Sequence, residues 1–440
     1  MSGPSEKPVK VLVILAAMAA GAALGALAGS DGLLGGIEVI KVCDFLGSLF
    51  INLLKMLVVP LVMSSVITGV AGIGTGRNLG RLGLTSFLFY LVTTLLAVLI
   101  ALCVLNLVQP GIVDGHPARD LLALHVDAAA VDLSVRAKAS GGLLDLLLGL
   151  VPTNIIEAAA GTKLLGLLFF SVLFGFFLTR IESPYRESVT TFWQGLFRVM
   201  MRMTEFVMRL APVGVFGLTA RVVARTGFAS AGPLLLFGLC VVASLALYAL
   251  VALPALIRVV GRVRPWGLFP ALAPALLTAF STASSSATLP LTMECTERRA
   301  GVSARVSGFV LPLGVSVNHA GSALYECAAA LFIAQAYGLH LSVLTQFTIV
   351  VLALVTSMGI AGIPAASLVG ITVILGAVGL PAEAIGVLLV LDRLLDMMRT
   401  AVNVLADASC AVIVARLSGE RDVLAATATA TATRQAPGKA

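Results

Sequence analysis

The sequence predicts an all-α polytopic membrane protein, and two observations carry that prediction. Its 440 residues are 59% hydrophobic and only 12% charged, with a mean hydropathy of +1.05. Soluble domains carry about 25% charged residues, so a soluble protein of this composition could not cover its surface. The chain also holds many windows without Asp, Glu, Lys or Arg, and about 20 apolar residues suffice to span a bilayer. These windows are residues 11–30, 56–76, 82–113, 226–257, 265–293, 306–325 and 327–382.

The first half of the chain is predicted to contain six conventional spans. They lie near residues 9–30, 46–73, 82–107, 143–179, 203–223 and 230–257. Pro60 should kink the second span, and the "VPTN" sequence at 151–154 should break the fourth. Arg198, Arg202 and Arg209 make the approach to the fifth span amphipathic, as in a helix that lies partly in the membrane interface.

Basic residues indicate the topology of these spans. Lys7 and Lys10 precede the first span, and the loops after the second, fourth and sixth spans are rich in arginine. The positive-inside rule places these loops and the N-terminus, residues 1–8, in the cytoplasm. The membrane is expected to be the inner or plasma membrane of the cell. The mixed-charge segment 114–138 is expected outside. The Ala/Thr-rich tail, 417–440, is expected to be cytoplasmic and disordered. A cleaved signal peptide is the disfavoured alternative for the first span, because its uncharged run is too long.

The second half contains two interrupted apolar segments. Residues 265–293 have a polar centre of Ser and Thr, and residues 343–378 have a Gly/Pro centre. A polar segment follows each, at 303–335 and 381–416. Irregular backbone at membrane depth is tolerated only where protein or a water-filled cavity satisfies it. Paired interrupted segments therefore predict inverted repeats around a site near the membrane midplane.

The last apolar segment carries a stripe of polar residues. At about 100° per residue, six side chains fall within an arc about 100° wide on one helix face. They are Asp392, Asp396, Arg399, Thr400, Asn403 and Asp407. A charged group at the centre of the bilayer costs about 2.5–3.5 kcal/mol, so these groups need partners. A bound solute and bound cations would supply them.

The types of residue on the stripe suggest their ligands. Arg399 offers a planar fork that suits a carboxylate, and Asp396 suits an ammonium group. Asp407 and Asn403 offer hard oxygen ligands for a small cation. The alternative is an ion-pair network that only holds helices together. It would explain Asp396 with Arg399, but it would leave Asp392 and Asp407 unpaired. Arg393, at the edge of the stripe, is expected near a membrane face.

A second polar segment, "LPLGVSVNHAGSALYE" at 311–326, lies within an apolar span. Its glycines and polar residues predict an unwound helix with free carbonyl groups, and the alternative is a tolerated polar interior in a broad bundle. Glu326 is costly at this depth unless it is neutral or paired. It is therefore a candidate proton carrier, and the alternative is a structural pair with a cation.

Other classes of function fit poorly. No basic run with interleaved aromatic residues indicates nucleic-acid binding. The six cysteines lack metal-type spacing, and no cofactor is expected. Ser284 to Pro290 could be mistaken for a nucleophile motif, but no ordered Ser/His/Asp set accompanies it, so an enzyme is not expected. A carrier and a channel remain, together with a receptor that does not transport.

At these residues the chain resembles the dicarboxylate/amino acid:cation symporter family, which includes bacterial glutamate and aspartate carriers and the animal excitatory amino-acid transporters. The matching motifs are "SSSATLP" (284–290), "NHAGSALYE" (318–326), "GIAGIP" (359–364) and "DMMRTAVNVLAD" (396–407). Weaker matches are "MLVVPLV", "YLVTT", "VPTN" and "APVGVF". The resemblance covers nearly the whole chain, from about residue 10 to residue 416, and the last-helix motif is highly specific.

The resemblance implies eight transmembrane helices plus two re-entrant helical hairpins, inverted repeats and a homotrimer that works as an elevator. Residues 9–258 would form helices 1–6, a scaffold from which helices 3 and 6 join the transport domain. Residues 259–416 would form the transport core: hairpin 1, helix 7, hairpin 2 and helix 8. The implied function is symport of an acidic amino acid or a C4-dicarboxylate with sodium, protons or both.

The resemblance also implies site residues. Substrate contacts would come from both hairpins and from the last two polar helices: Ala283, Ser285, Ser322, Ile363, Ser367, Asp396, Arg399, Thr400 and Asn403. Asp396 would bind the amine and Arg399 the side-chain carboxylate. Three sodium sites are implied. The first would use Gly314, Asn318, Asn403 and Asp407, and the second would use Ser316, Ser357, Met358 and Ile360. The third would use Tyr90, Thr93, Thr94 and Asn318. Glu326 matches the position proposed to carry a coupled proton.

The chain departs from the family pattern near the cation sites. Ala320 stands where the third site has Asp, and His319 stands where Met is usual. Ile360 replaces a small polar residue, and Ser367 replaces Gly. These differences bear on the coupling ion more than on the transport class. A neutral amino-acid carrier of the same family is the alternative, and Arg399 argues against it because neutral-selective relatives lack that charge.

Overall fold

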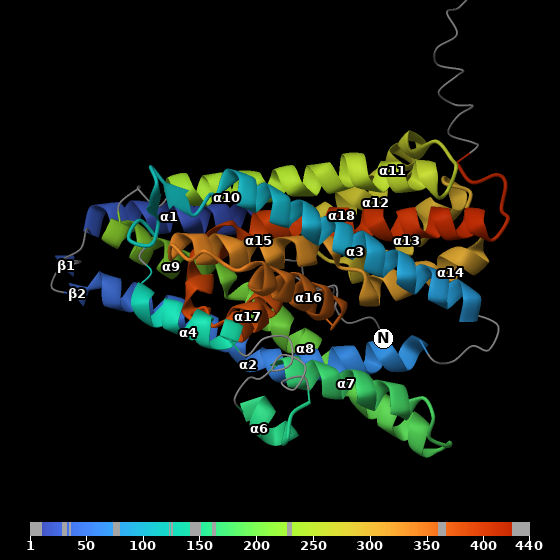
Figure 1. Cartoon of the computed structure of the whole chain (residues 1–440), viewed down its shortest axis with the longest axis horizontal. Helices are drawn as coiled ribbons and strands as arrows, with labels where there is room; N and C mark the ends of the chain where they lie inside the picture. Colours follow the sequence, from blue (N-terminus) through green and yellow to red (C-terminus); the bar gives the residue numbers. More distant parts are fainter. Residues whose placement is uncertain are drawn as a thin grey trace, which may run out of the picture.

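The computed structural model is a bundle of helices that run roughly along one long axis (Figure 1). Apart from two hairpins of two-residue strands, its regular elements are helical within the part of the chain that the structure describes. That part comprises residues 11–28, 33–34, 37–73, 80–122, 124, 126–140, 151–160, 164–226, 231–359 and 367–424. The C-terminal tail beyond Leu424 and the tip of the second predicted hairpin, 360–366, lie outside it.

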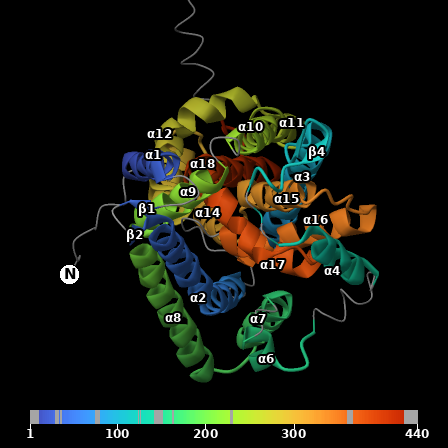
Figure 2. The ribbon, with the colours of Figure 1, turned by 90° about the vertical axis from the view of Figure 1, so that its left-hand side faces the viewer.

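One side of the bundle is formed by helices from the first half of the chain. They are α1 (Val11–Ala28), α2 (Val39–Ile73), α7 (Leu164–Leu178), α8 (Tyr185–Arg209) and α9 (Ala211–Thr226). Helix α2 packs against α7, α8 and α9, and α1 packs against α9 (Figure 2). Glycine residues of α1 permit its close contact with α9. A Cβ at Gly21 would overlap the Phe216 carbonyl oxygen, and a Cβ at Gly25 would overlap that of Ala220. Small residues let helix backbones approach this closely.

The predicted fourth and fifth spans are both interrupted. Residues 151–154 are not helical, as the "VPTN" sequence predicted, and the short helix α6 (Ile155–Ala160) begins after them. The predicted fifth span, 203–223, is not one helix, which corrects the sequence interpretation. It is divided at Leu210 between α8 and α9. Pro212 lacks an N–H group, and its ring would clash with a carbonyl of the preceding turn, so α8 ends there. Pro60 lies inside α2, which continues through it.

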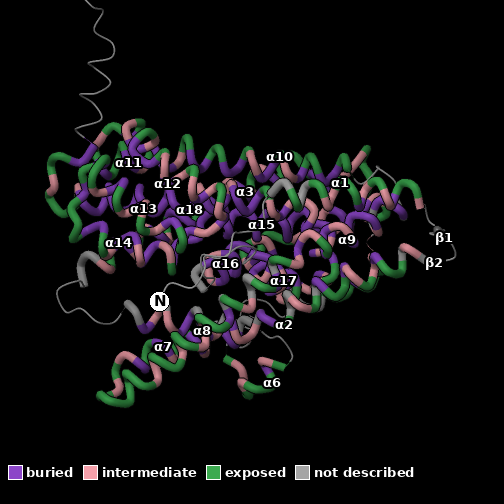
Figure 3. Tube along the Cα trace, turned by 180° about the vertical axis from the view of Figure 1, so that it is seen from behind, coloured by how far each residue is buried: buried purple, intermediate pink, exposed green. Residues whose placement is uncertain are grey.

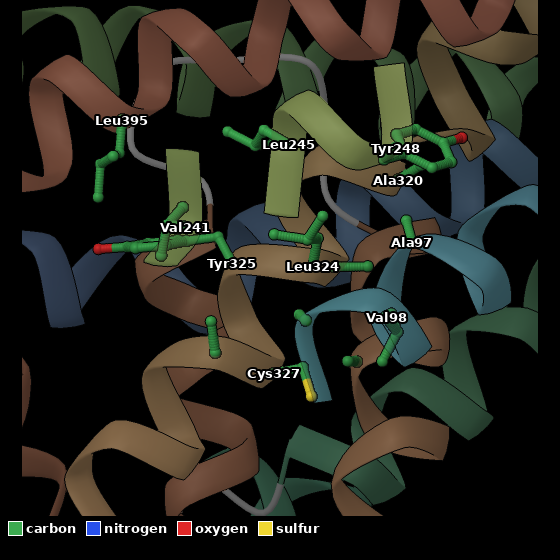
Figure 4. Packing of buried hydrophobic residues seen from close by; sticks show 14 of the residues in the cluster. Ala97, Val98, Val241, Leu245, Tyr248, Ala320, Leu324, Tyr325, Cys327 and Leu395 are labelled. Atoms are coloured by element: carbon green, nitrogen blue, oxygen red, sulfur yellow. The ribbon is translucent and has the colours of Figure 1, made fainter. Parts of the chain in front are cut away.

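Two further long helices pack against helices of the second half of the chain. Helix α3 (Gly80–Val108) packs along α15 (Ala320–Ala336). The other long helix consists of α10 (Ala231–Leu247), a π-helical turn η1 (Tyr248–Ala252) and α11 (Leu253–Val259). Side chains of Val98, Val241 and Leu324 from α3, α10 and α15 meet in the core (Figure 4). The core therefore lies between these helices and the last polar helix.

The first interrupted segment forms a helical hairpin. After a 3-10 turn η2 (Pro265–Gly267), α12 (Leu268–Thr282) and α13 (Ser285–Arg298) fold back on each other. Ala283, between them, has a left-handed backbone with φ of 49°. Ser284 caps α13 by accepting a hydrogen bond from the Ala287 N–H. The polar centre thus supplies the turn and the helix cap of this hairpin.

The following segment is an interrupted helix, as the sequence predicted. Helix α14 (Ala304–Val317) ends at Asn318, and α15 begins two residues later at Ala320. The second interrupted segment repeats the plan with α16 (Val343–Gly359) and α17 (Ser367–Val378), which pack against each other. A 3-10 turn η3 (Ala382–Ala384) leads into α18 (Ile385–Leu417). Buried residues concentrate in α15 and α18 (Figure 3).

The remaining elements are short. Strands β1 (Leu33–Leu34) and β2 (Ile37–Glu38) pair, as do β3 (Ile112–Val113) and β4 (His116–Pro117), and α4 (Ala128–Ser140) follows them. Within the described residues, three helices are long and apolar enough to cross a membrane: Gly83–Val108, Ala231–Val259 and Ala382–Leu417. Shorter apolar helices, among them Val343–Ser357 and Ser367–Val378, accompany them.

Candidate functional site

The polar stripe of α18 is buried inside the bundle. Its six residues are at most 6% exposed, and Arg399 is completely buried. Both arms of the first hairpin, α12 and α13, pack against α18, and so do α14 and α15. The stripe therefore faces protein on several sides.

Arg399 uses only one corner of its guanidinium group within the protein. Its Nη2 donates hydrogen bonds to Asp392 Oδ1 at 3.1 Å and to Asp396 Oδ1 at 2.9 Å. Its Nε and Nη1 have no hydrogen-bond partner among the described residues. The guanidinium carbon lies 3.9 Å from the centre of the Tyr325 ring. Tyr325 thus supports one face of the group, while donors on its edge remain for a planar acceptor.

Asp392 was expected to be unpaired if the stripe were only a structural network, and this expectation is wrong. The hydrogen bond from Arg399 pairs it. Asp407 also has a partner, because Asn318 Nδ2 donates to Asp407 Oδ1 at 2.7 Å. Every carboxylate of the stripe is therefore hydrogen bonded, and the need for a ligand rests on the unpartnered donors of Arg399 rather than on unpaired acids.

Arg393 belongs to the same network, which the sequence interpretation missed. Its side chain is only 12% exposed and its Nη1 lies 3.8 Å from Asp396 Oδ2; its expected position near a membrane face stays a prediction. The residue lies three positions before Asp396, which places the two side chains on neighbouring turns. The i, i+3 spacing in the sequence was the available signal.

A second polar cluster surrounds Asp407. Its Asn318 partner also accepts a hydrogen bond, from Thr94 Oγ1 to Oδ1 at 3.4 Å. Tyr90 donates its hydroxyl proton to the Val310 carbonyl at 2.9 Å. Gly314 makes room for the cluster. A Cβ there would lie 2.5 Å from Asp407 Oδ1 and 2.6 Å from the Tyr90 hydroxyl. The structure thus brings oxygen atoms from three helices together, a ligand set suited to a hard cation.

The helix break joins this cluster to the stripe. Asn318 and His319 are the two non-helical residues between α14 and α15. Asn403 Oδ1 accepts a hydrogen bond from the Gly321 N–H at 2.8 Å, which fixes the start of α15 against α18. His319 is 3% exposed, and neither ring nitrogen has a partner among the described residues. Ala320 is completely buried and contributes no carboxylate.

Other predicted cation ligands are not assembled in this way. Ser316 is exposed and donates to the Pro312 carbonyl, and Ser357 donates to the Leu354 carbonyl. Thr93 donates to carbonyls of its own helix, to Phe89 at 2.9 Å. Met358 lies in the last turn of α16, and its side chain is not among those that the structure describes. Ile360 and Ile363, at the predicted tip of the second hairpin, also lie outside the described residues.

The remaining predicted substrate residues occupy buried positions. Ala283 lies at the turn of the first hairpin, and Ser285 begins α13. Ser367 begins α17, Ser322 lies in the first turn of α15, and Thr400 donates to the Asp396 carbonyl. Each begins or ends a helix or lies on the stripe, which is where main-chain and hydroxyl donors can meet a ligand.

Glu326 is completely buried between α15, α16 and α17. Thr356 Oγ1 donates to its Oε2 at 2.6 Å, while Oε1 has no partner among the described residues. A Cβ at Gly370 of α17 would overlap its carboxyl group. Glu326 therefore contacts both arms of the second hairpin. The alternative from the sequence was a structural pair with a cation, but among the described residues its hydrogen-bond partner is the hydroxyl group of Thr356.

A bundle of apolar helices with two helical hairpins, a broken helix and a buried band of acids and guanidinium groups defines a membrane transport protein for charged solutes. The comparison with protein families agrees. The model of the sodium:dicarboxylate symporter family matches residues 11–417. The chain belongs to that family, which consists of secondary transporters and not of enzymes. It is a membrane protein, as its apolar helices also indicate.

Curated relatives align over most of their lengths. The proton/glutamate-aspartate symporter of Escherichia coli (strain K12) is 37% identical over 396 residues, which cover 88% of this chain and 90% of the relative. The proton/sodium-glutamate symport protein of Bacillus caldotenax is 34% identical over 375 residues, 85% of this chain and 87% of the relative. The C4-dicarboxylate transport protein of Anaeromyxobacter sp. (strain K) is 33% identical over 383 residues, which cover 86% of this chain and 84% of the relative.

Proposed function

We propose that this protein takes up glutamate, aspartate or a C4-dicarboxylate by symport with sodium, protons or both. The observation that carries the proposal is the edge of Arg399, whose Nε and Nη1 have no partner among the described residues although the side chain is fully buried. Buried guanidinium nitrogens without hydrogen-bond acceptors are costly, and a carboxylate is their best planar partner. A neutral amino-acid carrier would have no use for this charge.

The amine of an amino-acid substrate would bind Asp396, one turn before Arg399. Asp396 Oδ1 accepts a hydrogen bond from Arg399 Nη2. A substrate carboxylate bound to Arg399 and a substrate ammonium bound to Asp396 would therefore lie side by side. Thr400, Asn403 and the helix starts at Ser285 and Ser367 would complete the contacts. Ala283, Ser322 and Ile363 belong to the same proposed set.

The coupling cation would bind near Asp407, where Asn318, Asn403 and the backbone of Gly314 converge. The further sodium positions implied by the family pattern use Ser316, Ser357, Met358 and Ile360, and Tyr90, Thr93, Thr94 and Asn318. Support for the last set comes from the hydrogen bond between Thr94 and Asn318. Ala320 weakens that set, and Glu326, buried with one oxygen unpartnered, is the candidate proton carrier.

We also propose the family architecture: eight transmembrane helices and two re-entrant hairpins in a homotrimer of the inner or plasma membrane, with cytoplasmic termini. Helices α3 and α10–α11 would move with residues 259–416 as the transport domain, against a scaffold of the other helices from residues 9–258. The packing of α3 along α15 and of α10 against α18 supports that grouping.

Uptake of labelled aspartate into proteoliposomes tests the proposal. Saturable uptake that depends on an imposed sodium or proton gradient is expected. Aspartate-induced current without saturable uptake would indicate a channel instead. Binding without either uptake or current would indicate a receptor, and either result would refute the proposed symport.

A further inference from the structure

We propose that Arg393 is a specificity-determining residue that sets the balance between acidic amino acids and dicarboxylates without an amine. The inference rests on the proposed function. Its basis is the position of Asp396 between two guanidinium groups. Arg399 Nη2 lies 2.9 Å from Asp396 Oδ1, and Arg393 Nη1 lies 3.8 Å from Oδ2. The two oxygens of one carboxylate thus face two different cations.

Burial makes this second contact significant. The side chains of Arg393 and Asp396 are 12% and 6% exposed. Exposed pairs elsewhere in the protein, such as Arg298 with Glu294 at 79% and 56%, are screened by solvent and contribute little. At 3.8 Å the contact of Arg393 is electrostatic rather than a tight hydrogen bond. Arg393 therefore supplies charge to the site without fixing the Asp396 carboxylate in one orientation.

The charges of the network indicate what Arg393 does. Two acids, Asp392 and Asp396, and two cations, Arg393 and Arg399, sum to zero. The ammonium of an amino acid would compete with Arg393 for Asp396. A dicarboxylate brings no ammonium, and its carboxylate would occupy Arg399, so the positive charge of Arg393 would offset the repulsion between Asp396 and the second anionic group of the ligand. Removal of Arg393 should therefore favour substrates with an amine and disfavour substrates without one.

The test compares two ligands of matched length, L-aspartate and succinate. Wild-type protein and the variants Arg393→Gln and Arg393→Lys are reconstituted in proteoliposomes at one pH and one sodium concentration. Unlabelled aspartate or succinate then competes with labelled aspartate uptake. The ratio of the two half-inhibitory concentrations should shift toward aspartate by about tenfold in Arg393→Gln, because one full charge near the ligand is lost. Arg393→Lys should stay within about threefold of the wild type.

A matched control comes from Arg298→Gln on α13, which loses an exposed ion pair of similar length, 3.6 Å. Its ratio should equal that of the wild type. A general effect of lost helix stability would change uptake in both Arg393 variants without changing the ratio. If Arg393→Gln is not recovered in folded form, Arg393→Met and the thermal stabilisation of purified protein by each ligand give the same ratio.

The outcomes separate the inference from the proposed function. An unchanged ratio in Arg393→Gln, or an equal shift in Arg393→Lys, overturns the role of Arg393 and leaves the symport intact. Wild-type protein that succinate does not inhibit also overturns the inference alone. Wild-type protein that takes up neither aspartate nor succinate refutes the proposed function, and the inference falls with it.

Discussion

Arg399 is the residue that we propose recognises the charge of the substrate, because its guanidinium group is held in place and two of its nitrogens have no described partner. Two carboxylates bind its Nη2, and the Tyr325 ring covers one face. Its other two nitrogens have no described partner. A preorganised guanidinium group loses little conformational freedom when a carboxylate binds it, so more of the binding energy is retained.

Replacement of this residue should abolish recognition of acids. Arg399→Cys is expected to reduce uptake of aspartate, glutamate and succinate at least about tenfold, since loss of a buried hydrogen-bonded charge costs about 2–5 kcal/mol. The substitution also leaves Asp392 and Asp396 without their shared donor. Initial rates in proteoliposomes measure the effect, and unchanged uptake of all three acids would show that Arg399 does not bind substrate.

The amine should be recognised by Asp396. Asp396→Ala is expected to weaken aspartate binding far more than succinate binding, because only aspartate carries an ammonium and because Arg393 and Arg399 both gain free charge for a dicarboxylate. Competition curves for the two ligands provide the comparison. Equal losses for both ligands would instead assign Asp396 a purely structural role.

The sequence predicted which residues line the stripe but not how they pair. Helical periodicity alone places Asp392, Asp396 and Arg399 on one face. Periodicity gives no side-chain rotamers, so it did not predict the contact between Arg393 and Asp396. The same limit applies to Ser316 and Ser357, whose residue type suggested cation ligands although each hydroxyl bonds to a carbonyl of its own helix.

At the scale of single helices, glycine determines where buried acids fit. Helix α14 carries Gly314 opposite Asp407, and α17 carries Gly370 opposite Glu326. Glycine inside a helix costs about 1 kcal/mol relative to alanine. Each helix also carries a glycine with open space around it, Gly308 and Gly376. These pairs offer matched tests of the two acidic sites.

In α14, Gly314→Ala should impair the cation cluster. Its Cβ would lie 2.5 Å from Asp407 Oδ1, so the carboxylate or the Tyr90 hydroxyl must move. We expect the sodium concentration for half-maximal uptake to rise about tenfold or more, as for overpacking of a tight core. Gly308→Ala should leave this concentration unchanged. An unaltered sodium dependence in Gly314→Ala would exclude this cluster as a cation site.

In α17, Gly370→Ala should separate the second hairpin from Glu326. The new methyl group would overlap the carboxyl group, and strain of this kind costs about 1–3 kcal/mol. The melting temperature of the purified protein should therefore fall. Gly376→Ala should preserve or raise it, because alanine favours helix. A Gly370→Ala protein as stable as the wild type would show that the hairpin does not depend on this contact.

Most helices followed from sequence because apolar windows and polar centres are local features. The first hairpin and the break at Asn318 and His319 are examples. The division of the predicted fifth span at Leu210 was missed, since the apolar residues continue across it and only Pro212 marks the break. The close approach of α1 to α9 at Gly21 was also not predictable, because a glycine in an apolar helix does not identify its neighbour.

For the whole molecule, the proposed third cation site would bring together residues from distant parts of the chain. Tyr90 and Thr94 come from α3, while Asn318 and Ala320 come from the broken helix. Without an Asp at position 320, a cation among these neutral groups lacks a charged partner in a medium of low dielectric constant. We therefore expect this transporter to couple to fewer sodium ions than relatives with that Asp, with protons supplying part of the driving force. The alternative is that another acid, such as Asp392, replaces the missing carboxylate.

Reversal potentials in proteoliposomes count the coupled ions, and Ala320→Asp provides the matched variant. The variant should show a steeper sodium dependence of uptake, because the added carboxylate would supply the negative charge that the proposed third cation site lacks. A sodium count equal to that of an Asp-bearing relative, with no response to a pH gradient, would contradict this expectation for the wild type.

The pairing within α18 also bears on the return of the unloaded carrier. A symporter completes its cycle only when the protein without substrate reorients across the membrane. Asp392 and Asp396 with Arg393 and Arg399 form a group of zero net charge in the structure. Under the proposed elevator motion, this group would cross the low-dielectric interior as a neutral unit. We therefore expect these four groups to need no cation of their own on the return, whereas Asp407, whose described partner is the amide of Asn318, would cross as a further acid.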